Sequence, residues 1–441
     1  MSPPSPRRTG TALREAIVLA WSVFVIAAVV ALGGCADRRE AAGPVTLVFK
    51  HAKILGPNDP IPGLLREFER RHPGVSVRSE PLTWTSDEQH QFYVINLDGA
   101  SPTFDVLMLD VIWVPEFAQA GWLLDLSPWV TREELAPHFP AAVEVATWGG
   151  RVWGLPWNMN VGVVYYRADL LAKYGLTPPR TWEELVEQTQ RIRAGERDPR
   201  LDGVLWQGKQ YEGLVCNVLE HFWGSGAPLL GDDGRVLPEP ARAQAALAFM
   251  RGLVERAVSP GWVTAGDEEL TRRPFGDGRA VFLRSWPYAL DLFEQVDSPV
   301  RGRVGIAALP GHAGGAAGAG ATGGFHLAVN RATRHRDAAV ALVRFLADEP
   351  AQRALTAAGV ALYPTRMALY HDPEIVRARP HMPRFHDLMR AARPRPVTPY
   401  YLMLSTTVQP EFSAALVGVK TPEQALEHAR RRLEYMLDGI R

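Results

Sequence analysis

Aromatic side chains flanked by polar ones are the residues of this chain whose types and spacing best suit chemistry. The sequence has 13 tryptophans. Several form clusters with hydroxyl, carboxyl, amide or guanidinium groups: Trp84-Thr85-Ser86-Asp87, Trp157-Asn158-Met159-Asn160 and Arg284-Ser285-Trp286-Pro287-Tyr288. An aromatic ring packs on the apolar C–H face of a pyranose while polar neighbours hydrogen-bond its hydroxyls. The clusters therefore predict a carbohydrate-binding surface, with core packing as the alternative for any single tryptophan.

Motifs for catalysis and for cofactors are absent or out of context. The sequence has no H-E-x-x-H, G-x-S-x-G or G-x-x-x-x-G-K-[ST], and its 12 histidines form no ligand-spaced pair, so neither a metal nor a cofactor is expected. Residues 318–323 fit G-x-G-x-x-G, but a strand-like segment follows them, which predicts a mobile loop. Asp105, Asp110 or Glu116 could serve a glycoside-acting enzyme, whose chemistry depends on the separation of two carboxyl groups.

Length and composition limit the class of protein. The chain has 441 residues, of which 46% are apolar and 22% charged, which is typical of a globular protein with about two to four domains. Its 48 basic residues balance its 48 acidic ones. A nucleic-acid partner favours a strongly basic surface, so none is expected.

An export signal is predicted at the N-terminus. Three arginines precede the apolar run 16–32, which ends in Leu32-Gly33-Gly34-Cys35. This tetrapeptide resembles a bacterial lipobox, which implies that Cys35 is lipidated; an uncleaved membrane anchor is the alternative. Only Cys216 then remains, so no intrachain disulfide can form, and Cys216 is expected to be a buried apolar residue.

Alternating strand and helix patterns predict an α/β fold class that positions these residues. Strands are expected at 45–50, 75–77, 104–109, 279–283 and 304–308, and helices around 64–68, 245–257 and 337–346. Thr181 with Glu184, and Thr421 with Gln424, are typical of capping boxes that begin helices. Residues 154–166, with a Leu-Pro-Trp break, and 303–311 are expected to cross between two lobes and to act as a hinge.

Several long strings resemble one family. They are 206–216 (Trp-Gln-Gly-Lys-Gln-Tyr-Glu-Gly-Leu-Val-Cys), 105–113, 163–169, 286–288 and 393–401. Over these strings, and from about Val45 to the C-terminus, the chain resembles the extracytoplasmic sugar-binding proteins of ABC importers, nearest to the trehalose/maltose-binding proteins. The resemblance implies a type II periplasmic-binding-protein fold, with sugar bound in a cleft between two lobes that close about a hinge.

The resemblance also implies roles for particular residues. Asp110 would bind sugar hydroxyls, Trp286 and Tyr288 would stack on the sugar, and Arg395 would donate from the far lobe. Further ligand contacts are implied, on differing grounds, for Gly324, Phe325, Asn158, Asn160, Thr85, His90, Asp59 and Glu212. Asn158 and Asn160 replace a tyrosine and an aspartate of the family pattern, Phe325 a tryptophan and His90 an arginine, which makes trehalose or maltose specificity an open question. Glu212 could equally be an exposed helix carboxylate.

The resulting hypothesis is a lipid-anchored, non-enzymatic protein of the cell envelope. It would be an extracytoplasmic monomer that captures a di- or oligosaccharide for an ABC-importer permease. The alternatives are a secreted glycoside-acting enzyme and a ligand-sensing partner of a membrane receptor. The expected domains are a lipoprotein signal peptide (1–34), a lipid-anchored linker (35–44), lobe 1 (45–156 plus 305–358) and lobe 2 (157–304 plus 359–441).

Overall fold

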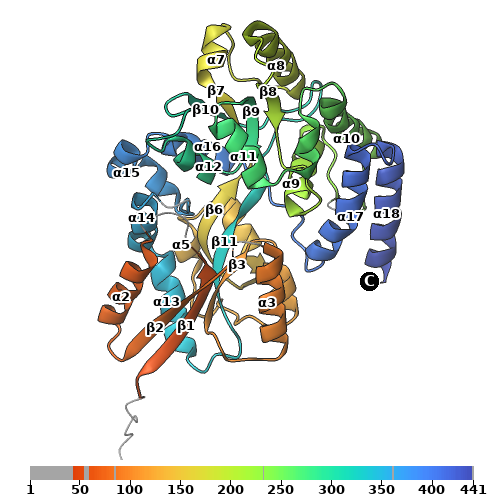
Figure 1. Ribbon diagram of the computed structural model, residues 1–441. Helices are drawn as coiled ribbons and strands as arrows, with labels where there is room; N and C mark the ends of the chain where they lie inside the picture. Colours follow the sequence, from red (N-terminus) through yellow and green to blue (C-terminus); the bar gives the residue numbers. More distant parts are fainter. Residues whose placement is uncertain (1–42, 54–58, 84–85, 232, 360–361, 440–441) are drawn as a thin grey trace, which may run out of the picture. The chain divides into compact units, whose positions relative to one another are not determined.

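The computed structural model describes residues 43–53, 59–83, 86–231, 233–359 and 362–439. The chain from Thr46 to Arg441 forms one compact unit (Figure 1). Cys35, the run 16–32 and Thr85 lie outside the described residues, so lipidation, export and a role for Thr85 stay predictions. Within the described part of the chain, no helix is long and apolar enough to cross a membrane.

Five strands form the first sheet, in the order β2-β1-β3-β11-β6. Their bounds are β1 Val45–Ala52, β2 Val75–Leu82, β3 Val106–Asp110, β6 Leu155–Val161 and β11 Thr322–Val329. Strands β1 and β3 are parallel, whereas β11 runs antiparallel to both β3 and β6. The helices α2 (Ile61–Arg71) and α13 (Arg336–Ala347) pack on this sheet. Tyr93 and Leu97 of α3 (Ser86–Asp98) pack in the same core as Leu107 of β3.

Four strands form the second sheet, in the order β10-β7-β9-β8. Their bounds are β7 Val163–Arg167, β8 Asp202–Leu205, β9 Ala280–Ser285 and β10 Val304–Ala307. The sheet packs against α8 (Trp182–Glu196) and α11 (Glu268–Gly276), while α9 (Glu212–Gly224) packs against α10 (Pro240–Glu255) and α17 (Tyr401–Leu416). The last helix, α18 (Pro422–Asp438), lies along α17 (Figure 1).

Shorter elements complete the described chain. They are α4 Val114–Gln119, α5 Arg132–Leu135, α6 Pro140–Val145, β4 Thr147–Trp148, β5 Arg151–Val152, α7 Ala168–Lys173, η1 Gly261–Ala265, α12 Tyr288–Phe293, α14 Glu349–Ala357, η2 Met367–His371, α15 Pro373–Ala378 and α16 Met382–Arg390.

Two neighbouring segments carry the chain from one sheet to the other. Gly162 alone separates β6 from β7, and residues 308–321 join β10 to β11. The Gly162 N–H donates to the Ala321 carbonyl over 3.1 Å. A Cβ on Gly320 would lie 2.2 Å from the Gly162 carbonyl oxygen, so only glycine allows this approach. The expected lobe boundaries at 156/157, 304/305 and 358/359 fall within β6, within β10 and just after α14, and they stay a prediction.

A buried ion pair lies beside these crossings. Glu220 of α9 and Arg284 of β9 each have side chains that are 1% exposed, and Arg284 donates to both oxygens of Glu220. The same carboxylate accepts from the Ala321 N–H over 2.9 Å. A Cβ on Gly162 would lie 2.0 Å from Oε1 of Glu220. One carboxylate thus joins α9 and β9 to both crossing segments.

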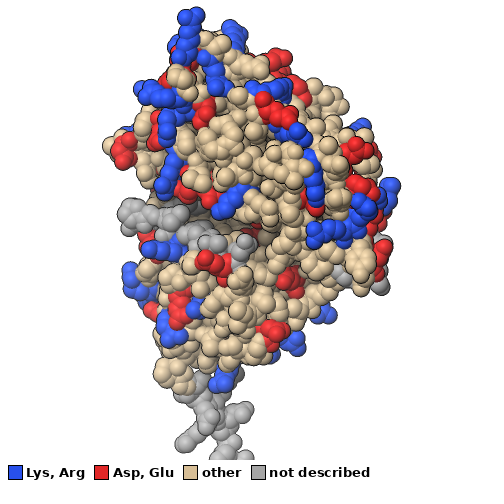
Figure 2. Space-filling view, turned by 45° about the vertical axis from the view of Figure 1, so that its right-hand side comes forward, with Lys and Arg blue, Asp and Glu red and all other residues tan. Residues whose placement is uncertain are grey.

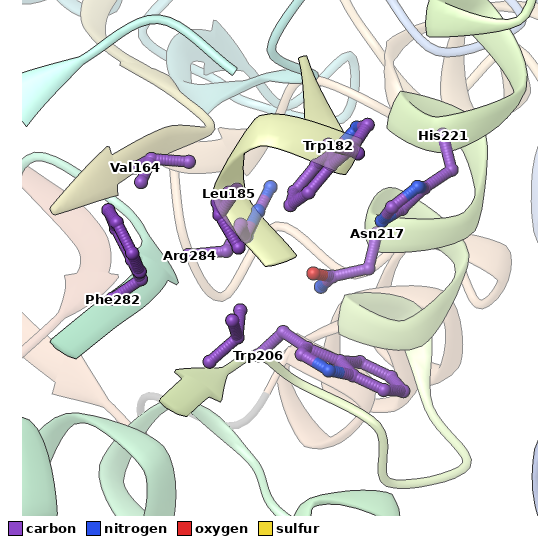
Figure 3. Close-up of a pocket in the computed structure, with 9 residues that line it drawn as sticks. Val164, Trp182, Leu185, Trp206, Asn217, His221, Phe282 and Arg284 are labelled. Atoms are coloured by element: carbon purple, nitrogen blue, oxygen red, sulfur yellow. The ribbon is translucent and has the colours of Figure 1, made fainter. Parts of the chain in front are cut away.

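The interior behind the second sheet contains a small cavity around the same arginine (Figure 3). Side chains from α8, α9, β7 and β9 line it, including Trp182, Asn217 and Arg284. Nη1 of Arg284 donates to Oε1 of Gln207 over 3.1 Å, and Asn217 donates to the same oxygen over 3.2 Å. All three guanidinium nitrogens of Arg284 therefore bond within the core.

Most predicted elements are confirmed, and three local predictions are wrong. The Thr421 capping box forms in full, and Cys216 is buried. At Thr181 the hydroxyl caps Glu184, but the Glu184 carboxylate accepts from Arg180 and not from Thr181. Pro156 does not interrupt strand β6, because β6 lies at the edge of its sheet, where proline is tolerated. The glycine run packs closely, since a Cβ on Gly318 would lie 2.0 Å from the Leu309 carbonyl oxygen.

Candidate functional site

Asp110 and Arg395 meet where β3 ends. Arg395 follows α16 by five residues, and its Nη2 lies 3.8 Å from Oδ1 of Asp110. Burial raises the pKa of the Asp110 carboxyl to about 6, while the positive charge of Arg395 and the Ile112 N–H limit the rise. Both side chains are largely buried, at 16% and 6% exposure. The structure thus brings together Asp110 and Arg395, two residues that are predicted to hydrogen-bond the sugar.

Glu212 holds Arg395 in place. Its Oε1 accepts from Nη1 of Arg395 over 2.7 Å and from the Tyr401 hydroxyl over 2.6 Å. Its Oε2 accepts from the Ser405 hydroxyl. Because α17 and the segment after α16 both supply partners to this carboxylate, the expectation of an exposed helix carboxylate is wrong. The Nε of Arg395 is buried and has no hydrogen-bond partner among the described residues.

Strands β6 and β11 place polar groups beside Asp110. Phe325 is the register partner of Asp110 in β3 and of Asn158 in β6. Oδ1 of Asn158 accepts from the Phe325 N–H over 2.8 Å. Gly324 has φ +120°, and a Cβ there would lie 2.3 Å from the Asn158 carbonyl oxygen, so only glycine fits. Asn160, two residues after Asn158 in β6, is the register partner of Gly323.

The aromatic residues form a wall that α11 supports. Trp286 follows β9, and its ring lies close to position 323, where a Cβ would be 3.4 Å from it. The Arg284 guanidinium lies 4.1 Å from the centre of the Trp286 ring on its buried side. Tyr288 begins α12, and its hydroxyl donates to Oε1 of Glu269 over 3.4 Å.

Glu268 connects this wall to a further aromatic residue. Its Oε1 accepts from Nε1 of Trp286 over 3.3 Å, and its Oε2 accepts from the Tyr211 hydroxyl over 2.7 Å. Sequence reasoning missed Glu268, although it follows the N-cap residue Asp267 at the start of an amphipathic helix. Glu268 and Glu269 thus fix both rings of the predicted wall from one helical turn.

His90 and Asp59 are the remaining predicted residues that the structure describes. Nε2 of His90 lies 3.0 Å from Oε2 of Glu116, and its ring packs edge-on against Trp113. The charge on His90 is near enough to affect the pKa of the Asp110 carboxyl. Asp59 is exposed and accepts from the Ile61 N–H over 2.9 Å at the start of α2. Within the described part of the chain, Asp59 forms no hydrogen bond or ion pair with another predicted site residue.

The carboxylates considered for glycoside chemistry have other partners. Asp105 is buried, and it accepts from the Val48 N–H over 2.8 Å and from the Thr333 hydroxyl. Five residues of extended chain separate its backbone from Asp110 by about 16 Å, beyond the roughly 5–9.5 Å between a glycosidase's two carboxyl groups. Glu116 pairs with His90. The separation of Asp105 and Asp110 does not favour hydrolysis by that pair.

Unpaired buried atoms gather at this site. Among the described residues, Nδ2 of Asn158, Oδ1 of Asn160, Oγ1 of Thr322 and Nε of Arg395 have no hydrogen-bond partner. Buried polar atoms in folded proteins are nearly always paired, so donors and acceptors left over beside an aromatic wall suit a neutral ligand rich in hydroxyls.

The described residues contain no cluster of three or more metal-ligating side chains. In Figure 2, charges of both signs are interspersed over the visible face.

Comparisons with known proteins agree with this geometry. Residues 56–353 match the family model for bacterial extracellular solute-binding proteins. A probable ABC transporter-binding protein of Deinococcus radiodurans is 36% identical over 83% of this chain and 87% of its own length. An uncharacterized lipoprotein of Streptomyces antibioticus is 26% identical, with 87% of this chain and 84% of that protein covered.

A solved structure extends the comparison to the fold. The maltose-bound MalE3 of T. maritima is 36% identical, with a TM-score of 0.81, and the match covers 89% of this chain and all of that one. Its two-lobe fold is the one expected here. The chain belongs to the family of bacterial extracellular solute-binding proteins, which are binding proteins and not enzymes.

Proposed function

We propose that this protein captures a di- or oligosaccharide in the cleft between its lobes and delivers it to the permease of an ABC importer. Closure of the lobes would follow from the ligand, since a sugar that touches both lobes stabilises only the closed state. The maltose bound to MalE3 of T. maritima, 36% identical to this chain, supports an α-linked glucose disaccharide as the first ligand to test.

The observation that carries the proposal is the pairing of stacking rings with unpaired polar atoms. Trp286 is partly exposed and held by Glu268, while Asn160 lies near the same ring across Gly323. A pyranose offers an apolar face to the ring and hydroxyls to the amide and guanidinium groups.

Particular residues take particular roles in this proposal. Asp110 accepts sugar hydroxyls, Arg395 donates, and Trp286 and Tyr288 stack. Asn158, Asn160 and Phe325 set which sugar fits, and Gly324 lets the backbone approach it. Glu212 and His90 act through Arg395 and Asp110, which they hold and polarise. A contact from Thr85 or Asp59 stays a weaker part of the proposal.

Attachment to the membrane is the part of the proposal that concerns the N-terminus. Acylation of Cys35 would hold the protein at the outer face of the membrane, beside its permease. The likeness to a lipoprotein of Streptomyces antibioticus supports it. Mass spectrometry of the protein from membranes should find a chain that begins at an acylated Cys35, and an unmodified Cys35 would contradict the anchor.

Isothermal titration of the full chain, kept in a detergent without a sugar headgroup, tests sugar capture. Maltose, trehalose and longer α-linked glucose oligomers form the panel. We expect saturable heat at one sugar per protein with at least one of them, together with a change in tryptophan fluorescence. No heat and no fluorescence change with any sugar would overturn the proposal. Sugar turnover would instead support an enzyme.

A further inference from the structure

A second groove lies among elements that pack with the first sheet, and no predicted sugar-contacting residue lines it. Its cavity volume is about 310 Å³, and the groove is partly open to solvent. Its walls come from the end of α2, from α5, from the start of β6 and from the end of α13. This volume lies at the lower end of the roughly 300–1,000 Å³ typical of small-molecule sites. The groove is therefore large enough for a ligand of its own.

Three arginines line the groove, and two of them are paired with glutamates. Arg71 pairs with Glu67 over 2.7 Å, and Arg344 pairs with Glu134. The guanidinium of Arg366 has no carboxylate within ion-pair distance among the described residues. Its Nε donates to the Ala347 carbonyl over 3.0 Å, which leaves both Nη groups available.

The backbone around Arg366 is fixed. Arg366 forms an antiparallel bridge with His138, and its N–H donates to Oε1 of Gln352 over 3.2 Å. Burial lowers the pKa of the Arg366 guanidinium, while the charges of Asp348, Glu349 and Glu134 oppose that change. Burial and the positive charge of Arg366 together lower the pKa of His138 to about 3, so this histidine is neutral and does not compete for an anion.

The acidic groups near Arg366 already have partners. Oε2 of Glu134 accepts from the Thr131 N–H over 2.9 Å, and Oδ1 of Asp348 accepts from the Ala351 N–H over 2.8 Å at the start of α14. Glu349 pairs with Arg353. Among the described residues, Arg366 is thus the groove arginine without a carboxylate partner, and its half-buried guanidinium is held by the Ala347 carbonyl.

One part of the groove is apolar. Val130, Leu155, Phe345 and Ala347 line it, and each is buried. A planar guanidinium binds a carboxylate through two parallel hydrogen bonds, which suits the two free Nη groups. We propose that this groove is a second ligand site, for a small organic carboxylate whose apolar body lies against Leu155 and Phe345 and whose head pairs with Arg366.

The groove and the sugar site share strand β6. Leu155 begins the strand, whereas Asn158 and Asn160 lie further along it, about 10–16 Å away at strand spacing. A carboxylate in the groove would therefore not occupy the sugar site. The two ligands are expected to bind together and not to compete.

Isothermal titration with 2-naphthoate tests the proposal, with neutral 2-naphthamide as its isostere. The full chain should bind 2-naphthoate saturably, at one molecule per protein, and 2-naphthamide at least about tenfold more weakly, because a charge-assisted pair is lost. Arg366→Gln should weaken 2-naphthoate binding by a similar factor. Arg366→Lys, which keeps the charge but not the fork, should fall between the two.

Arg334→Gln is the matched control, because Arg334 is exposed and does not line the groove. Equal binding of naphthoate and naphthamide, or unchanged naphthoate binding in both Arg366 variants, would overturn the proposal. Displacement of bound 2-naphthoate by a sugar in the cleft would also overturn the proposal. Failure of every sugar to bind would affect only the proposed function and would leave these comparisons intact.

Discussion

Two buried arginines of this protein differ in how much of their hydrogen-bonding capacity the protein itself uses. Arg284 lies in the interior of the second sheet, where Glu220 and Gln207 bind all of its guanidinium nitrogens. Arg395 is held by Glu212 and by the Thr322 carbonyl, yet its Nε has no partner in the described chain. We therefore expect the first arginine to stabilise the fold, whereas in the proposed function the second keeps a donor for the ligand.

Removal of the charge on Glu220 should give the largest effect. Glu220→Gln leaves Arg284 buried without a counter-charge, which costs about 3–5 kcal/mol in the free energy of unfolding. Urea denaturation measures the loss. Glu427→Gln, in an exposed pair with Arg430 on α18, is the control and should cost less than about 1 kcal/mol. Similar losses of unfolding free energy in the two variants would mean that the buried Glu220–Arg284 pair stabilises the fold no more than an exposed ion pair does.

Substitution of Arg395 should act on binding more than on stability. Arg395→Gln removes a charged donor from the proposed sugar site, and we expect sugar affinity to fall by about 1.5–3 kcal/mol. Titration calorimetry measures it, with Arg390→Gln on the exposed face of α16 as the control. If Arg395→Gln reduced the free energy of unfolding as much as Glu220→Gln and left affinity unchanged, the contrast between the arginines would be wrong.

Loss of the Trp286 ring should weaken binding somewhat less. Trp286→Ala removes the proposed stacking surface, worth about 1–3 kcal/mol on the scale measured for bases stacked on aromatic side chains. Trp262 is 40% exposed and outside the wall, so Trp262→Ala should bind sugar normally. Unchanged affinity in Trp286→Ala would remove this residue from the site, while Arg284 beneath it would keep its structural role.

A change of pH should affect sugar affinity and fold stability in opposite directions, and both effects should come from the Arg395 region, through Asp110. The pKa of Asp110 is raised to about 6, so the carboxylate becomes protonated as pH falls from 7 to 5. Sugar affinity should then fall by up to about tenfold, because a charged acceptor is lost. The free energy of unfolding should instead rise over the same fall in pH. The pKa of Asp110 is raised in the folded protein, so protonation of Asp110 favours the folded state, and this contribution is lost as pH rises through 6.

Asp110→Asn provides the control for this titration. Its sugar affinity should be low and nearly constant between pH 5 and 7, measured by tryptophan fluorescence. A pH profile in this variant equal to that of the natural protein would assign the titration to another group.

Local patterns predicted much of the fold. Alternation identified β1, and glycine and proline marked the end of α2 at His72. The failures arose where tertiary context decides. Pro156 is accommodated because β6 is an edge strand, and the glycine run packs because backbone from distant segments lies against it.

The site was predicted only in part, because its parts are far apart in sequence. Glu212 and Arg395 lie 183 residues apart, and no spacing rule connects them. Glu220 and Arg284 had a usable signal, since each is a charged residue beside apolar neighbours in an element that is largely buried. Family resemblance supplied Asp110 and Trp286, whose roles still depend on binding measurements.

The side chain of Gly162, which is a single hydrogen atom, limits which sequences this fold can accept. Any larger residue there would collide with the Glu220 carboxylate, which also holds Arg284 and the Ala321 N–H. Positions 162, 220 and 284 are therefore expected to evolve as a unit: alanine at 162 becomes acceptable only where the acid at 220 is shortened or withdrawn. A relative that differs at one of these positions should differ at another, and this covariation could be sought in any collection of related sequences.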